Sequence, residues 1–133
     1  MNRILIVDDD APSRELLSDF LEVVGYLTEA VGSAEEGLAS ARRYLPDLVL
    51  MDLGLPGLDG LAATRHLKED PITSQVPIIA TTAHAMKGDA EQSLEAGCDA
   101  YIAKPVDLSN LLATVGRLLE RTNSDPFAAG AAE

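Results

Sequence analysis

The sequence predicts an α/β fold in which a five-stranded parallel sheet carries helices on both of its faces. Short apolar runs rich in β-branched residues alternate with helix-like segments along the 133 residues. Runs such as Ile4–Val7 are apolar throughout, which is typical of strands buried on both sides. Because parallel neighbours need right-handed crossover connections, this alternation predicts a sheet covered by helices on both faces.

The first two strand–helix units are indicated by their turn and cap residues. Pro12 suits a first helical turn after the first strand, and Gly25 stops that helix. A weaker strand follows, and then Ser33 and Glu36 have the spacing of a capping box at the start of a second helix. Pro46 marks the end of this second unit.

The remaining three units repeat the same order. Gly97 closes the fourth helix in the manner of a left-handed cap, and the leucines of the fifth helix recur at i, i+3 and i+4. The predicted strands are Ile4–Val7, Leu27–Ala30, Asp47–Met51, Val76–Thr81 and Tyr101–Ala103. The predicted helices are Pro12–Val24, Ser33–Tyr44, Leu58–Glu69, Met86–Ala96 and Leu108–Leu119.

Length and composition restrict the class of protein. The chain suits one domain, expected at residues 1–121, with a flexible end at 122–133 and no output domain; Met1 directly before the first strand favours a complete start. The net charge of −12 repels nucleic acids and anionic membrane surfaces, so we expect neither as a partner. With a single cysteine, Cys98, and no apolar run near the ~20 residues of a membrane span, the protein is expected to be cytoplasmic.

Chemically useful side chains follow four of the five predicted strands. In open parallel sheets, ligands bind outside the carboxyl ends of the strands, where the strand order reverses. The residues at these strand ends are Asp8, Asp9 and Asp10 after the first strand, Asp52 after the third, Thr81 and Thr82 after the fourth, and Lys104 and Pro105 after the fifth. The second strand delivers nothing comparable.

This set of side chains favours phosphoryl chemistry. Asp8, Asp9 and Asp52 brought together repel one another unless a cation lies between them, and Lys104 alone does not balance three carboxylates. Mg²⁺ prefers such hard oxygen ligands. Thr82 and Lys104 then remain to hold an anion beside the metal. A phosphoryl group fits that place, with the Asp52 carboxylate as the nucleophile.

Each of these residues also has a plain structural explanation. An Asp run after a strand commonly caps a helix, and Asp52 alone suits a turn. Thr82 alone suits a strand end, and a lysine before a proline is usually exposed. Their joint arrangement favours the functional interpretation. Cys98 is expected to be a packing residue, and His66 a solvated helix residue; no Cys/His cluster suggests zinc, and no Gly-rich nucleotide loop is present.

The motifs "ILIVDDD", "DLVLMDLGLPGLDG", "PIIATTA" and "YIAKP" occur in that order and spacing. Over Asn2 to Arg121 the chain resembles the bacterial two-component response-regulator receiver domains, the CheY-like family. The resemblance is closest to stand-alone receivers and to receivers of hybrid sensor kinases, through "TAHAMKGD" and "AGCDAYIAKP". It implies a (βα)5 flavodoxin-like fold and a phosphoprotein acting in phosphorelay signal transduction.

The resemblance also implies a role for each site residue. Asp52 accepts phosphate from a sensor histidine kinase or a histidine phosphotransfer protein, with Mg²⁺ or Mn²⁺ held by Asp9, Asp52 and the Gly54 carbonyl, and by Asp8 through water. The remaining implied roles belong to phosphoryl binding and switching: Thr82 with the Ala83 amide, Lys104, a cis peptide bond before Pro105, and Tyr101 as the rotating aromatic. Phosphorylation then changes the face of the fourth helix, fifth strand and fifth helix, where a downstream protein binds.

Two positions depart from the commoner family pattern. Many receivers carry a longer side chain two residues after the phosphorylated aspartate, where this chain has Gly54. Two residues after Thr82 stands His84, whose ring either leans over the phosphoryl group or faces solvent. Because relatives use this pair to tune the lifetime of the acyl phosphate, we hypothesise that water access here depends mainly on His84.

Two other classes of protein remain as alternatives. The first is a Mg²⁺-dependent phosphatase of the haloacid-dehalogenase type, in which Asp8 and not Asp52 is phosphorylated. Pro12 disfavours it, because that motif expects Thr or Val there, and no acidic pair follows a later strand. The second is an interaction module that signals without phosphate, which the complete set of acids, Thr82 and Lys104 disfavours.

Overall fold

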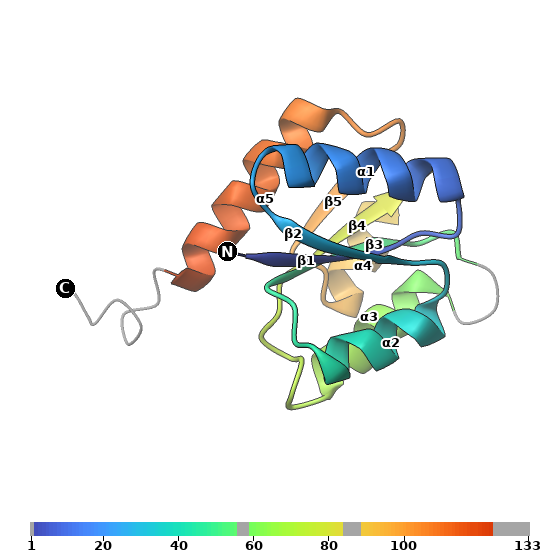
Figure 1. The fold of residues 1–133 in the computed structure, drawn as a ribbon. Helices are drawn as coiled ribbons and strands as arrows, with labels where there is room; N and C mark the ends of the chain where they lie inside the picture. The colour runs from blue at the N-terminus through green and yellow to red at the C-terminus, as the bar shows by residue number, and fades with distance from the viewer. Residues whose placement is uncertain (1, 56–58, 84–88, 124–133) are drawn as a thin grey trace.

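Five parallel strands form one sheet in the spatial order β2-β1-β3-β4-β5, with helices on both faces (Figure 1). The computed structural model describes residues 2–55, 59–83 and 89–123. The strands are β1 (Arg3–Val7), β2 (Leu27–Val31), β3 (Leu48–Asp52), β4 (Ile78–Thr82) and β5 (Ala100–Ala103). The helices are α1 (Ala11–Val23), α2 (Ala34–Arg43), α3 (Gly60–Glu69), α4 (Asp89–Ala96) and α5 (Leu108–Asn123). The predicted fold class is confirmed.

The two faces of the sheet bury separate cores because successive side chains of a strand point to opposite sides. In β1, Leu5 and Val7 belong to the core beneath α2 and α3, whereas Ile4 and Ile6 belong to the core beneath α1 and α5. The central strands β1, β3 and β4 are therefore apolar on both faces, which explains their continuous apolar runs.

Strand register brings the carboxyl ends of the strands to one edge. Val7 pairs with Met51, Asp52 with Thr81, and Thr82 with Ala103. The strand order reverses at β1, which lies between β2 and β3. The residues just beyond β1, β3, β4 and β5 consequently share one end of the sheet, as expected for a binding edge.

Caps define the beginnings of the first two helices. Asp10 is the N-cap of α1, where its side chain accepts from the Ser13 N–H at 3.1 Å. Ser33 caps α2 as predicted, accepting from the Glu36 N–H at 3.1 Å. Glu36 reaches back to the N–H of Gly32 at 3.2 Å rather than to that of Ser33. The capping box is therefore one residue wider than its usual form.

Several predicted boundaries shift by a few residues. β3 includes Asp52, so the acid ends the strand instead of following it. β4 begins at Ile78 because the N–H of Val76 turns to the Thr73 carbonyl at 3.1 Å. α3 begins at Gly60, and the predicted start at residue 58 lies outside the described residues, as does the start of the fourth helix at residue 86.

The ends of α4 and α5 compare differently with the predictions. Gly97 has a φ of 112° after α4, the left-handed cap expected from the sequence. α5 runs through Asn123, two residues into the segment predicted as a flexible end, and residues 124–133 lie outside the described part of the chain. In the described residues no helix is long and apolar enough to cross a membrane.

Candidate functional site

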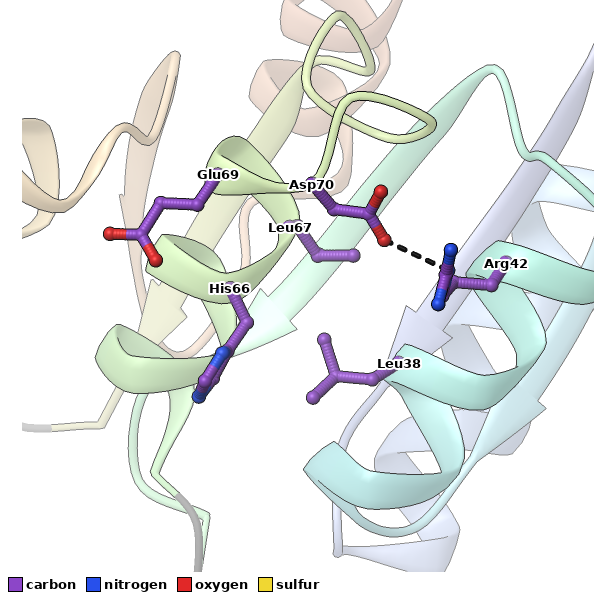
Figure 2. A pocket seen from close by; sticks show the side chains of 6 residues that line it. All are labelled: Leu38, Arg42, His66, Leu67, Glu69 and Asp70. Carbon is purple, nitrogen blue, oxygen red and sulfur yellow. Dashed lines mark ion pairs between the residues drawn. The ribbon is translucent and has the colours of Figure 1, made fainter.

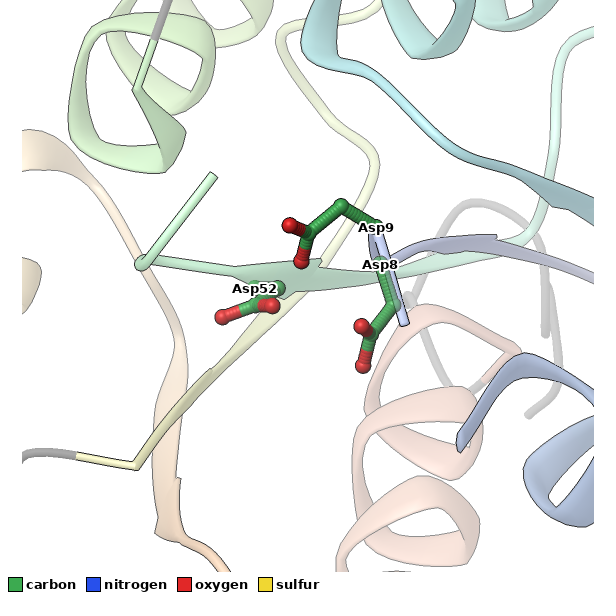
Figure 3. Close-up of side chains that lie close together, drawn as sticks. All are labelled: Asp8, Asp9 and Asp52. Carbon is green, nitrogen blue, oxygen red and sulfur yellow. The ribbon is translucent and has the colours of Figure 1, made fainter. Parts of the chain in front are cut away.

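Three carboxylates meet at the carboxyl edge of the sheet. Asp8 and Asp9 follow β1 and Asp52 ends β3, and each offers an oxygen within 4.8 Å of the others (Figure 3). Asp8 is 2% exposed and Asp52 is 5% exposed, while Asp9 is open to solvent. The cluster therefore joins two buried carboxyl groups to a third that is exposed to solvent.

Asp8 is held at four of its atoms. Its N–H donates to the Val31 carbonyl at 3.1 Å, and its own carbonyl accepts from Arg14 Nη1 at 2.8 Å. Its Oδ1 accepts from the Asp10 N–H at 2.9 Å, and its Oδ2 lies 3.0 Å from Lys104 Nζ. The position of this carboxylate is therefore set by groups from three separate elements.

Asp52 uses its two oxygens differently. Oδ1 accepts from the Gly54 N–H at 2.9 Å, and Oδ2 lies 3.3 Å from Lys104 Nζ. Burial raises the pKa of Asp52 above its ordinary value, and the charge of Asp8 adds to this, while the Gly54 hydrogen bond and Lys104 oppose it. A carboxylate that is costly to keep charged gains from any further cation placed beside it.

Lys104 bridges the two buried acids from the loop after β5. Burial by itself lowers the pKa of Lys104, but the hydrogen bond to Asp8 and the charge of Asp52 outweigh it, and the pKa is raised overall. The ammonium thus stays charged. The peptide bond between Lys104 and Pro105 is cis, as the sequence predicted.

The other predicted site residues lie around this cluster. Thr82 ends β4 and is 4% exposed, one position beyond the Thr81 that pairs with Asp52; Ala83 follows it at the surface. Tyr101 in β5 is half-buried and packs against the core beneath α2 and α3. Gly54 is exposed, and His84 lies outside the described residues.

The donor set fits a divalent cation. Carboxylate oxygens are the hard ligands that Mg²⁺ and Mn²⁺ accept, and the exposed Asp9 leaves room for retained waters. Three carboxylates against the single ammonium of Lys104 also leave uncompensated negative charge, which buried acids tolerate poorly.

Two residues that support the site were not expected from the sequence. Arg14 reaches the Asp8 carbonyl from α1, and its only sequence signal is a cation six positions after Asp8. Gly60 starts α3 so close to β3 that a Cβ there would lie 2.3 Å from the Asp52 carbonyl oxygen. The three consecutive acids have different roles, since Asp10 caps α1 whereas Asp8 and Asp9 line the site.

Hollows on the described surface include one beside the site and one between two helices. One of about 440 Å³ adjoins the site and has an apolar wall formed by Leu16, Leu17, Pro105 and Val106. The other, of about 360 Å³, lies between α2 and α3, where Arg42 Nε and Asp70 Oδ2 pair at 2.9 Å over an apolar floor (Figure 2). His66 stands exposed at its rim, as predicted, and none of its lining residues reaches the acidic cluster.

Cys98 lies apart from the site. It is a free, buried thiol, with Sγ 3.8 Å from Thr64 Oγ1, and burial raises its pKa above the ordinary value. A thiol that stays protonated is a poor nucleophile. The predicted packing role is therefore consistent with its surroundings.

Known proteins of one family resemble most of the chain. A sequence model described as the response regulator receiver domain matches residues 4–116. The polar-differentiation response regulator DivK of Brucella ovis is 42% identical over 112 residues, covering 84% of this chain and 91% of DivK.

Solved structures agree with this assignment. The receiver domain of sensor histidine kinase PA1611 from Pseudomonas aeruginosa PAO1, which has a magnesium ion coordinated in its active site cleft, is 36% identical with a TM-score of 0.82 and covers 89% of this chain and 97% of its own. The receiver domain of a signal transduction histidine kinase from Syntrophus aciditrophicus is 37% identical, with a TM-score of 0.84, and covers 90% and 91%. The chain therefore belongs to the response regulator receiver family, the phosphoacceptor domains of two-component signalling that receive their phosphoryl group from a kinase.

Proposed function

We propose that Asp52 is the residue that accepts the phosphoryl group. The observation that carries this proposal is the convergence of the Asp8, Asp9 and Asp52 carboxylates within 4.8 Å, with Lys104 Nζ 3.3 Å from Asp52 Oδ2. An oxygen of Asp52 attacks phosphorus, the bond from phosphorus to the donor histidine nitrogen breaks, and that nitrogen leaves with the electron pair. The product is an acyl phosphate on Asp52.

The surrounding residues align the group and neutralise its charge. Asp9, Asp52 and the Gly54 carbonyl would hold Mg²⁺ or Mn²⁺ directly, and Asp8 would hold it through water. When bound, the cation would supply positive charge that offsets the charge on the phosphoryl oxygens. Lys104 already lies 3.0 Å from Asp8 Oδ2, so its ammonium needs only a small displacement to meet a phosphoryl oxygen on Asp52.

The remaining residues turn the modification into a change of surface. A phosphoryl group brings up to about two negative charges and new acceptor oxygens, toward which the Thr82 hydroxyl and the Ala83 N–H donate. Movement of Thr82 frees space for Tyr101, which is half-buried in the neighbouring strand. The face of α4, β5 and α5 then shifts between two populations, and a downstream protein binds one of them.

The partners follow from the same site. A sensor histidine kinase or a histidine phosphotransfer protein supplies the phosphoryl group, and the apolar hollow beside Lys104 offers that donor a contact next to the acceptor. The net charge of −12 disfavours direct contact with nucleic acids or anionic membranes. The cytoplasm, expected from the sequence, is the compartment in which we propose that it acts.

Incubation with acetyl phosphate and Mg²⁺, followed by intact mass measurement, tests this assignment. The parent protein should gain one phosphoryl group, and Asp52→Ala should gain none. A phosphorylated Asp52→Ala variant would contradict the acceptor assignment. A parent that stays unmodified would instead support the interaction module that signals without phosphate.

The phosphatase alternative has a separate test. In that reading Asp8, not Asp52, carries the phosphoryl group, and Pro12 and the missing acidic pair after a later strand disfavour it. We expect no turnover of p-nitrophenyl phosphate by the parent or by Asp8→Asn. Turnover that disappears in Asp8→Asn would revive that alternative.

A further inference from the structure

We propose that Arg14 is a positioning residue for the metal-binding carboxylates, an inference that rests on the proposed function. Arg14 lies in the second turn of α1, and its Nη1 donates to the backbone carbonyl of Asp8 at 2.8 Å. Its guanidinium thus holds the peptide group that joins the two acids Asp8 and Asp9. It acts on the backbone of the site rather than on the cation.

Arg14 holds the peptide group between Asp8 and Asp9, whereas Val31, Asp10 and Lys104 hold the N–H and the side chain of Asp8. After β1 ends at Val7, the chain carries Asp8 and Asp9 across the site before Asp10 starts the cap of α1. Asp9 is exposed, and its carboxylate is the one in the cluster that lies open to solvent. The Asp8 carbonyl belongs to the same peptide unit as the Asp9 N–H, so a fixed carbonyl limits rotation of that unit. Arg14 therefore restricts where the Asp9 carboxylate can lie.

Gly32 leaves room for the guanidinium. A Cβ at Gly32, in the turn between β2 and α2, would lie 3.1 Å from Arg14 Nη1 and 3.7 Å from Cζ. The N–H of Gly32 is bound by Glu36 Oε1 at 3.2 Å, so that turn is fastened to α2. Arg14 is half-buried, and the missing side chain at Gly32 gives its guanidinium space to reach the Asp8 carbonyl.

The charge of Arg14 and its hydrogen bond to the Asp8 carbonyl affect Mg²⁺ affinity in opposite directions. Arg14 is a cation near a cation site, so removal of its charge alone would strengthen Mg²⁺ binding. Removal of its hydrogen bond loosens the Asp8–Asp9 peptide and weakens Mg²⁺ binding, because part of the binding free energy is then used to order that segment. The sign of the change in affinity therefore separates the two roles.

The test compares Arg14→Met with the parent by calorimetric titration of the metal-free protein with Mg²⁺. Methionine keeps an unbranched apolar stem about as long as the aliphatic part of arginine, while it removes the donor and the charge. We expect about a five- to tenfold weaker Kd, the size of one lost hydrogen bond from a charged group. Arg14→Lys retains a donor on a flexible stem and should recover part of the affinity.

Arg42→Met is the matched control, because Arg42 is a helix arginine that pairs with Asp70 and lies away from the acidic cluster. The Mg²⁺ affinity of Arg42→Met should stay within about twofold of the parent value, because Arg42 is exposed, pairs with Asp70 and makes no contact with the cluster of Asp8, Asp9 and Asp52 among the described residues. A Kd for Arg14→Met equal to or tighter than the parent's would overturn the proposal. Should Arg14→Met fail to fold, the same criterion applies to Arg14→Lys.

A second measurement does not involve the metal. The N–H of Asp10 donates to Asp8 Oδ1 at 2.9 Å, so its hydrogen exchange reports the order of this segment. In metal-free buffer, exchange at Asp10 should be about tenfold faster in Arg14→Met and unchanged in Arg42→Met. Equal exchange in parent and Arg14→Met would contradict the inference. Failure of the proposed function is distinct, since it would appear as an unmodified parent or a phosphorylated Asp52→Ala variant in acetyl phosphate, whatever the Mg²⁺ affinity of Arg14→Met.

Discussion

The Oδ1 atom of Asp52 accepts a hydrogen bond from the N–H of Gly54 at 2.9 Å, and a Cβ added at Gly54 would lie 3.5 Å from that same oxygen. This is an ordinary contact distance, so Gly54→Ala should fold normally. The methyl group would stand beside the phosphorylated carboxylate and hinder water. We expect the acyl phosphate to last about two to five times longer, measured as phosphate release in Mg²⁺ buffer. A shortened lifetime would show that position 54 does not limit water access.

His84 is predicted to control water access to the phosphoryl group. With only a glycine at position 54, the imidazole is the larger of the two tuning groups. His84→Ala should therefore lose phosphate about two to ten times faster than the parent. Loss at the parent's rate, in the same Mg²⁺ buffer, would rule out this role for His84.

Neutralising Asp52 should stabilise the metal-free fold. Because burial raises its folded pKa, Asp52 destabilises the protein at pH values above that pKa, and the penalty is relieved as pH falls through it. Asp52→Asn keeps an acceptor for the Gly54 N–H and removes the charge. In EDTA at neutral pH we expect a melting temperature about 2–5 °C above the parent's, with the gain shrinking on acidification.

Mg²⁺ provides the control for that experiment. Binding to the folded state raises the parent's melting temperature by mass action. The variant lacks one anionic ligand, so its response to added Mg²⁺ should be smaller. If Asp52→Asn is less stable than the parent in EDTA, the ion pair of Asp52 with Lys104 in the parent stabilises the fold by more than the burial of the Asp52 charge destabilises it.

Lys104→Met is expected to affect Mg²⁺ binding and phosphorylation in opposite directions. Lys104 Nζ pairs with both Asp8 and Asp52, so the cation competes with this ammonium for the same oxygens. Removing it should tighten Mg²⁺ binding severalfold, the reverse of the change expected for Arg14→Met. Phosphorylation by acetyl phosphate should nevertheless slow by about 10²-fold, because one charge that stabilises transfer is gone. Unchanged Mg²⁺ affinity would show that displacing Lys104 from Asp8 and Asp52 does not reduce the free energy of Mg²⁺ binding.

Gly60→Ala should strain the acceptor strand. A Cβ at position 60 would lie 2.3 Å from the Asp52 carbonyl oxygen and 2.7 Å from the Leu53 Cα, both backbone atoms. We expect a loss of about 1–3 kcal/mol in urea unfolding. Gly116→Ala in α5 is the matched control, because its Cβ meets nothing within 4 Å, and it should gain about 0.5–1 kcal/mol. Equal stability of the two variants would contradict the close packing at Gly60.

The structural and the functional explanations of the acidic residues both hold, but for different residues or for different oxygens of one residue. Asp10 is the helix cap that an Asp run suggests, which leaves Asp8 and Asp9 for the site. Asp52 serves both roles at once, since Oδ1 binds the turn at Gly54 while Oδ2 faces Lys104. Residue type and spacing were enough to find these positions, but not to divide the oxygens between roles.

Local patterns in the sequence determined the fold class and the side chains at the strand ends. Apolar runs, caps such as Ser33 and stops such as Gly97 act through neighbours in the chain, so they are legible without a structure. The order of parallel strands then places Asp52 and Lys104 at one edge. These inferences need only periodicity and connection rules.

Only the tertiary structure decided which groups hold those side chains in place. Arg14 meets the Asp8 carbonyl and the turn at Gly32, and Gly60 meets the backbone of Asp52, because segments distant in sequence or separated by a loop pack together. Such contacts depend on how α1 and α3 lie against the sheet and leave no local pattern of their own. The sequence by itself determined which side chains stand at the strand ends and what chemistry they can support. Packing decided what holds them in place, because the contact at the Asp8 carbonyl and the close approach at Gly60 arise only when the elements come together.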